Sequence, residues 1–184
     1  NWWGDASGPS GEGPGTGDSV SADVAFCPWL DAAFPGGSAV GGTVAQNIDT
    51  GESFCTIQEA IDDSDTDDGD TIQINAGIYT ENLDVNKAVD LVGAGSGTNP
   101  ASNTILREDS NATVVNLDAS GTSSDPITFQ NLRVEPVGEY GFEVRNGVSV
   151  EYVTFDNVFV IGSNPGDSTE SEVGLKVATT GSLN

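Results

Sequence analysis

Residues 127–134 read ITFQNLRV, and residues 153–160 read VTFDNVFV. The two stretches align without a gap, so that each residue of the first matches a residue 26 positions later. Apolar residues alternate with polar ones on either side of the central asparagine, as in a strand with one inward face. A recurrence of this length in short β-branched and aromatic runs is typical of repeat architectures. The alternative is a β-sandwich in which two strands resemble each other by chance.

Stacking the two copies in parallel would bury their apolar faces and place Asn131 over Asn157. Stacked side-chain amides can hydrogen-bond one another along such a column. We therefore predict that Asn131 and Asn157 are stacking residues at a bend of the chain.

Further strand patterns flank this pair and are joined by turns rich in Gly, Asn, Asp and Ser. GFEV at 141–144 recurs as GLKV at 174–177, with a longer loop at 162–172 between the two copies. One short helix is predicted at 56–62, where Thr56 and Glu59 form a capping box. Many strands of this kind without crossover helices favour an all-β solenoid, in which strands and turns follow one another in successive coils. The other predicted strands lie at 71–74, 77–85, 88–95, 104–108, 113–119 and 140–147.

Composition divides the chain at about residue 50. Residues 1–50 are rich in Gly, Pro, Ser and Asp, which predicts a loop-built cap or linker segment. Residues 51–184 are expected to form the solenoid, with an incomplete last coil. The two cysteines, Cys27 and Cys55, favour a disulfide between the segment and the body, and two free buried thiols are the alternative.

The charge balance narrows the range of partners. Asp and Glu number 29, Lys and Arg number 5, and the formal net charge is −24. This balance argues against nucleic acid, which requires a basic surface, and against anionic membrane surfaces. No apolar run approaches the roughly 20 residues of a membrane-spanning helix. The acidity fits calcium, and it equally fits surroundings of high salt.

The run DDSDTDDGD at 62–70 is the candidate calcium site. A bound cation would relieve the repulsion among adjacent carboxylates, although the run lacks the spacing of an EF-hand. The alternative is a solvated acidic turn between the helix and the first strand. The candidate ligands are Asp63, Asp65, Asp67, Asp68 and Asp70.

Two stretches resemble a known superfamily. TIQEAIDD at 56–63, followed by GDTIQINAGIYTENLDVNKAVDLVGAG at 69–95, resembles the opening of pectin-esterase and pectate-lyase-like proteins. The resemblance implies a right-handed parallel β-helix with a short N-terminal capping helix. NWWGDASGPSGEG at 1–13 and GDSVSADVAFCPWL at 17–30 resemble a segment that closes such helices in secreted and surface proteins of bacteria and archaea. Because that segment stands first here, the resemblance implies that residues 1–50 cap a neighbouring module.

Catalytic residues of the superfamily do not carry over. The resemblance implies two Asp and an Arg in esterases, and Arg or Lys beside calcium in lyases. The arginines of this chain are Arg107, Arg133 and Arg145, and no motif around Arg133 matches either family. Without histidine, an acid–base pair would have to consist of two carboxylates. The sequence therefore predicts no catalytic residue, no cofactor other than Ca²⁺, and a non-enzymatic role.

The sequence favours an extracellular, cell-surface module that joins head to tail with like modules into a stalk, sheath or filament. A polysaccharide-binding or polysaccharide-cleaving module, with a groove flanked by loop 162–172, is the alternative. A trimeric phage tail spike is a third interpretation.

Overall fold

The computed structural model describes residues 1–11, 15–21, 27–40, 42–108, 112–137, 140–162, 173–177 and 182–183. The protein is mostly β-structure, with one short helix in this part of the chain. This confirms the predicted predominance of strands. The elements before the body are β1 (Ser10–Gly11), β2 (Ser19–Val20), β3 (Trp29–Leu30), β4 (Ala39–Val40), β5 (Ala45–Asn47), β6 (Ser53–Phe54) and the helix α1 (Ile57–Asp62).

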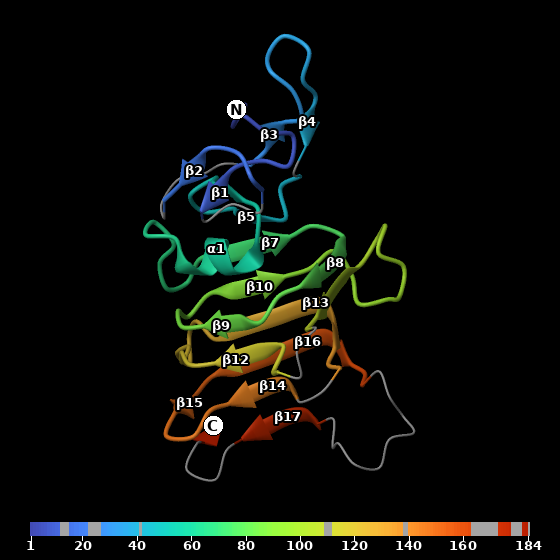
Figure 1. Cartoon of the computed structure of the whole chain (residues 1–184). Coiled ribbons are helices and arrows are strands. Elements are labelled where there is room, and N and C mark those ends of the chain that lie inside the picture. The colour runs from blue at the N-terminus through green and yellow to red at the C-terminus, as the bar shows by residue number, and fades with distance from the viewer. Residues whose placement is uncertain are drawn as a thin grey trace.

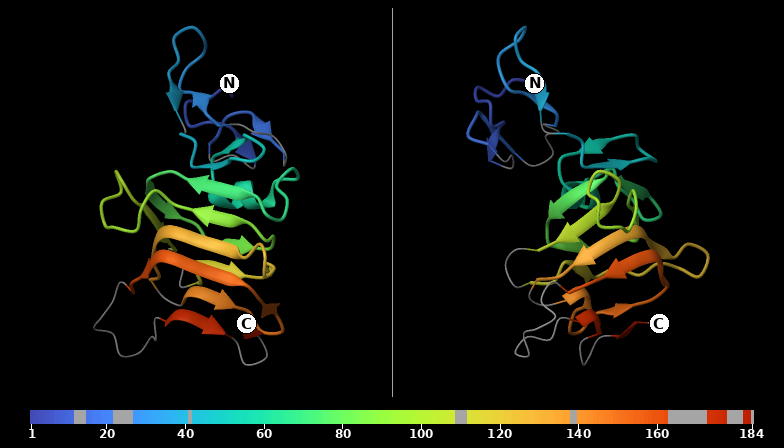
Figure 2. Two further views of the ribbon diagram at one scale, coloured as in Figure 1. Left: turned by 180° about the vertical axis from the view of Figure 1, so that it is seen from behind. Right: turned by 90° about the vertical axis from the view of Figure 1, so that its right-hand side faces the viewer.

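The body consists of short strands that pair in parallel and form three ladders, of which the third lies across from the first (Figures 1 and 2). The first ladder is formed by β7 (Thr71–Ile74), β10 (Asp90–Val92), the first half of β13 (Ile127–Glu135) and β16 (Val153–Val160). The second joins β8 (Gly77–Thr80), β11 (Thr104–Arg107) and the second halves of β13 and β16. The third joins β9 (Leu83–Val85), β12 (Val115–Leu117), β14 (Tyr140–Val144) and β17 (Val173–Val177), and β15 (Ser149–Val150) pairs with β18 (Ser182–Leu183).

The predicted register of the repeated strands is confirmed. Ile127 pairs with Val153, and Val134 pairs with Val160. The second recurrence is also confirmed, because Phe142 pairs with Leu175. The alternative, in which these strands resemble each other only by chance, therefore does not hold, since the copies are hydrogen-bonded neighbours.

Corresponding strands are spaced unequally along the chain. In the first ladder, successive strands lie 19, 38 and 26 residues apart. The longest interval includes the loop 93–103, which connects β10 to β11. The ladders keep their register because extra residues are accommodated in the loops.

The core lies between the three ladders and is filled by alternate residues of each strand. Ile72, Leu91 and Phe129 follow one another along the first ladder and are fully buried. Leu83 and Val115 hold the same position on the third ladder and are also fully buried. Each methylene group buried in this way contributes about 0.8 kcal/mol, and this burial is the main stabilising contribution.

Helix α1 covers the end of the core next to β7 and β9. Its apolar side chains Ile57, Ala60 and Ile61 are fully buried. The predicted capping box is present, since Thr56 Oγ1 accepts from the amide of Glu59 at 3.1 Å and the Glu59 carboxylate accepts from the amide of Thr56. The helix therefore closes one pole of the body.

The described residues of 1–40 extend beyond this closed pole (Figure 1). In this N-terminal segment β1 and β2 pair in parallel, and β3 and β4 pair antiparallel. The next strand, β5, already belongs to the first sheet, because it pairs antiparallel with β7. The division predicted at residue 50 thus falls after a strand that pairs with the body.

Candidate functional site

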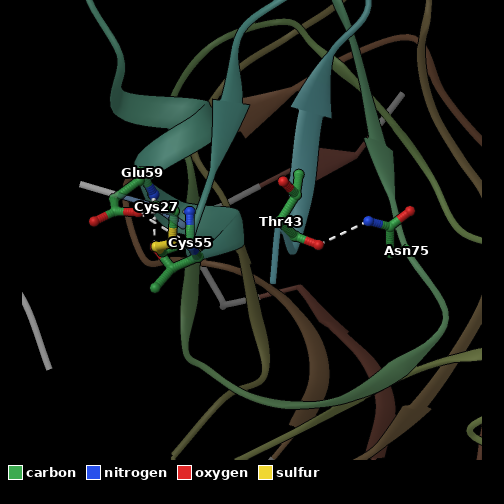
Figure 3. Close-up of a disulfide and its surroundings, with 6 residues drawn as sticks. Cys27, Thr43, Cys55, Glu59 and Asn75 are labelled. Carbon is green, nitrogen blue, oxygen red and sulfur yellow. Dashed lines mark hydrogen bonds between the residues drawn. A yellow bond between two sulfur atoms is a disulfide. The ribbon is translucent and has the colours of Figure 1, made fainter. Parts of the chain in front are cut away.

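The two predicted cysteines form a disulfide (Figure 3). The Cα atoms of Cys27 and Cys55 lie 5.6 Å apart, within the usual range for such a bridge. Cys55 directly precedes the capped end of α1, and its amide donates to Glu59 Oε2 at 3.1 Å. The bridge therefore joins the N-terminal segment to the element that closes the body.

The structure brings the two predicted stacking asparagines together. Asn157 Nδ2 donates to Asn131 Oδ1 at 2.8 Å, and both residues have positive φ, 52° and 56°. The hydroxyl of Ser96, from loop 93–103, donates to Asn157 Oδ1 at 2.9 Å. The two amides thus lie where each long strand bends from the first ladder into the second.

The acidic run follows α1 and forms the turn that leads to β7. Within the described residues, no group of three or more His, Cys, Asp or Glu side chains is arranged to hold a metal ion. Several of the predicted ligands instead accept hydrogen bonds that shape the turn, so calcium binding there stays a prediction. Asp63 Oδ1 accepts from the amide of Asp65 at 2.9 Å, Asp68 Oδ1 from that of Ala88 at 2.8 Å, and Asp70 Oδ2 from Asp67 N at 3.0 Å and Asn47 Nδ2 at 2.8 Å.

Arg133, the arginine considered for catalysis, is held in an ion pair on the second ladder. Its guanidinium and that of Arg107 both contact the carboxylate of Glu135, with Arg107 Nη2 at 2.5 Å. Burial acts to raise the pKa of Glu135, but hydrogen bonds from Arg133 and Arg107, together with their charges, outweigh it and hold the pKa below its ordinary value. This arrangement suits a structural cross-link between strands.

The remaining basic side chains also have acidic or carbonyl partners. Arg145, which directly follows β14, contacts Asp84 in β9 and Asp118 directly after β12, the latter at 3.0 Å. Lys176 lies 2.8 Å from Glu143 and 4.2 Å from the ring centroid of Tyr140. The fifth basic side chain is that of Lys87, whose Nζ donates to the carbonyl oxygen of Asp63 at 2.5 Å.

The pole opposite α1 exposes the apolar ends of the ladders. Phe155 pairs with the buried Phe129 but is 39% exposed. Leu175 pairs with Phe142, which is 1% exposed, and is itself 38% exposed. Val177 is 41% exposed on the same strand. These three residues, which we call the open end, occupy core positions at the last described strands of the ladders.

Sequence reasoning missed several residues that hold the closed pole. The Gln58 side chain donates to the carbonyl of Asp84 at 3.2 Å and accepts from its amide at 2.8 Å. The Glu81 carboxylate accepts from the amides of Ile57 and Gln58 at 2.9 and 3.1 Å. Desolvation raises the pKa of Glu81, although these amide hydrogen bonds act to lower it. No local pattern signals these contacts, because the partners lie more than 20 residues apart.

One predicted feature lies almost wholly outside the described residues. Loop 162–172, proposed as one flank of a saccharide groove, falls there except for residue 162. Within the described part, no helix is both long and apolar enough to cross a membrane.

Comparison with known proteins gives one informative similarity. No family model matches the chain, and no solved structure matches it. The chain is 32% identical over 128 residues to a protein named "Cell surface glycoprotein" from Methanothermus fervidus. The aligned region covers 66% of this chain and 19% of that protein. The chain therefore spans about a fifth of the length of a relative that its name places at the cell surface.

Proposed function

We propose that the chain is an extracellular, non-enzymatic module of a surface-associated protein, built as a right-handed parallel β-helix. This module joins end to end with similar modules to form a stalk, sheath or filament. The parallel ladders support the β-helix, because successive strands of each ladder are joined through the other two. The similarity to a cell surface glycoprotein and the disulfide support the location.

The open end is the observation that carries this proposal. Its three residues hold ladder positions whose neighbours one strand earlier are 0–1% exposed. Apolar side chains at such positions are covered when another strand of the same kind is added. The partner that fits them is therefore an apolar, strand-forming surface, such as that of a like module.

The N-terminal segment of a second copy is the partner that we propose. It lies at the opposite pole from the open end (Figure 1) and exposes two large apolar side chains. Phe34 is 85% exposed and Trp2 is 36% exposed. A contact between opposite poles is heterologous and repeats, so it generates a linear chain of modules.

Sedimentation velocity of the full chain tests this proposal. We expect concentration-dependent association in about 1 M NaCl, where the Debye length is about 3 Å and like charges no longer keep the modules apart. Leu175→Glu should abolish the association, because it places a charge at the open end. Phe159→Glu is the matched control, since Phe159 is 52% exposed on β16 but pairs with Arg133 on the outer face.

Two results would contradict the proposal. One is a wild-type chain that stays monomeric at every concentration and salt level. The other is an equal effect of the two substitutions, which would point to a lateral contact. Far-UV circular dichroism of each variant establishes that its strands are intact.

No described observation favours the polysaccharide alternative. Each of the five Lys and Arg side chains has a carboxylate or carbonyl partner, so the described surface offers no unpaired Lys or Arg side chain to an acidic glycan. Glycan-array binding and uronate-release assays distinguish this alternative from end-to-end joining.

A further inference from the structure

We propose that the Cys27–Cys55 disulfide is a positioning strap, which fixes the direction in which the N-terminal segment points. Breaking the strap would release the segment from its orientation without unfolding either the segment or the ladders. This inference rests on the proposed function, because it assigns to the strap the presentation of the joining segment.

The N-terminal segment is held together by its own hydrogen bonds. The amide of Leu30 donates to the carbonyl of Asn1 at 2.6 Å, and the amide of Asp18 donates to that of Trp3 at 2.5 Å. The Trp29 indole donates to the carbonyl of Ala6 at 3.2 Å. The bonds made by Leu30 and Trp29 link the described residues on either side of Cys27, and the Asp18 bond closes the part before it, so this part of the segment is held together independently of the body.

The described residues of the segment show bonds to the body at two points. One is the polypeptide itself, which joins the body at residues 43–44. Asn75 Nδ2 donates to the carbonyl of Thr43 at 2.7 Å (Figure 3). The amide of Val44 donates to the carbonyl oxygen of Phe54 at 2.9 Å. The other is the disulfide at Cys27. A unit attached at one point can rotate about it, whereas a second attachment removes most of that freedom.

The strap is fixed to a rigid part of the body. Cys55 stands directly before the N-cap residue of α1, whose apolar face is buried in the core. The carboxylates of Glu59 and Glu81 accept from the amides of Cys55, Thr56 and Ile57, and so hold the backbone at and directly after this point. The position of Cys27 is therefore set by the body, and with it the direction of Trp2 and Phe34.

Orientation matters for joining because a fixed binding surface loses less entropy on contact than a freely rotating one. With the strap intact, the segment presents its apolar residues in one direction, away from the closed pole. Without it, only a fraction of the molecules would present them correctly at any time.

The chain offers separate signals for its two parts. All three tryptophans, Trp2, Trp3 and Trp29, lie in the N-terminal segment, so their fluorescence reports on that segment alone. Far-UV circular dichroism reports mainly on the ladders. Small-angle X-ray scattering of the dilute monomer reports where the segment lies relative to the body.

The experiment compares the oxidised chain, the chain treated with dithiothreitol, and the Cys27→Ser/Cys55→Ser variant. We expect reduction and the double substitution to change the scattering profile in the same way, with the wavelength of the tryptophan emission maximum and the far-UV circular dichroism unchanged. Association in sedimentation velocity should weaken by about tenfold or more. The double variant is also the control for the reductant, because dithiothreitol should not affect it.

The outcomes separate this inference from the proposed function. An unchanged scattering profile would overturn the strap, even if the chain associates. A red shift of tryptophan emission would also overturn it, because the bridge would then be needed to fold the segment. A changed profile in a chain that never associates would support the strap as a conformational device and contradict end-to-end joining.

Discussion

Two asparagines make the bend that lets one long strand serve two ladders. Asn131 and Asn157 both adopt positive φ, a region in which Asn is tolerated better than most residues. Their amides also bond to each other, so each side chain contributes to the backbone conformation and to the contact between strands.

Substitutions at Asn131 separate these two contributions. Asn131→Gly should lose the amide bond and cost about 1 kcal/mol of unfolding free energy. Asn131→Ala should cost roughly 1–2 kcal/mol more than glycine, because a Cβ atom is disfavoured at positive φ. Denaturant unfolding of the two variants measures the difference. Equal stability of the two would show that the backbone conformation at this position adjusts freely.

The Glu135 carboxylate links two arginines of the second ladder and makes stability depend on pH. Its pKa is lowered in the folded protein from an ordinary value of 4.5. The folded state therefore binds a proton less readily than the unfolded state. The resulting stabilisation is present above about pH 4.5 and is lost as the pH falls through the lowered pKa.

Glu135→Gln should reduce the unfolding free energy at pH 7 by about 1–3 kcal/mol, because the arginines lose a charged acceptor. Near pH 3 the difference from wild type should shrink. Denaturant unfolding at the two pH values measures this change. The exposed Glu52 provides the control, and Glu52→Gln should have an effect within about 0.5 kcal/mol. A loss of equal size at both pH values would rule out the charge as its cause.

At the scale of the elements, α1 closes one pole partly because one of its side chains hydrogen-bonds the edge of β9. The Gln58 side-chain amide donates to the carbonyl of Asp84 and accepts from its amide, as a neighbouring peptide unit would. The outer edge of β9 is thereby occupied at that residue. Unpaired strand edges invite association, so Gln58 helps to keep this pole from adding strands.

Gln58→Ala should expose the Asp84 amide and speed its hydrogen exchange, with a loss of about 1–2 kcal/mol of unfolding free energy. Exchange measured by NMR or mass spectrometry follows this amide directly. Gln130→Ala is the control, because Gln130 bonds to Asp156 on other strands and should leave the Asp84 amide protected. Unchanged exchange in Gln58→Ala would mean that other contacts protect this edge.

The elements that could be predicted are those with a local signature. The repeats at 127–134 and 153–160, with their period of two, specified both the strands and their register. The capping box specified the start of α1 through Thr56 and Glu59. Contacts made by Gln58, Glu81 and Ser96 could not be foreseen, because they depend on how distant segments are placed in space and leave no local pattern.

Over the whole molecule, net charge is the dominant electrostatic property. The formal charge is −24, and the few basic groups are already engaged. Self-repulsion of this size favours the unfolded chain at low ionic strength. The sequence alone specified the net charge, but it could not decide whether the acidity reflects calcium binding or surroundings of high salt.

Raising NaCl from about 0.01 M to 1 M should increase Tm, because the Debye length falls from about 30 Å to about 3 Å. KCl should have the same effect, and differential scanning calorimetry measures both. A further rise with CaCl₂ at matched ionic strength, abolished by Asp67→Asn, would identify the loop 62–70 as a calcium site. A Tm independent of NaCl would contradict the role assigned to repulsion.

The unequal spacing of corresponding strands has a practical consequence. The interval that contains loop 93–103 is twice the shortest one, and Leu91 still aligns with Ile72 and Phe129. A foreign peptide inserted within this loop should therefore be displayed on the flank of an undisturbed scaffold. Because adjacent strands are about 4.8 Å apart, peptides grafted onto successive loops would be presented at a regular spacing set by the separation of the strands.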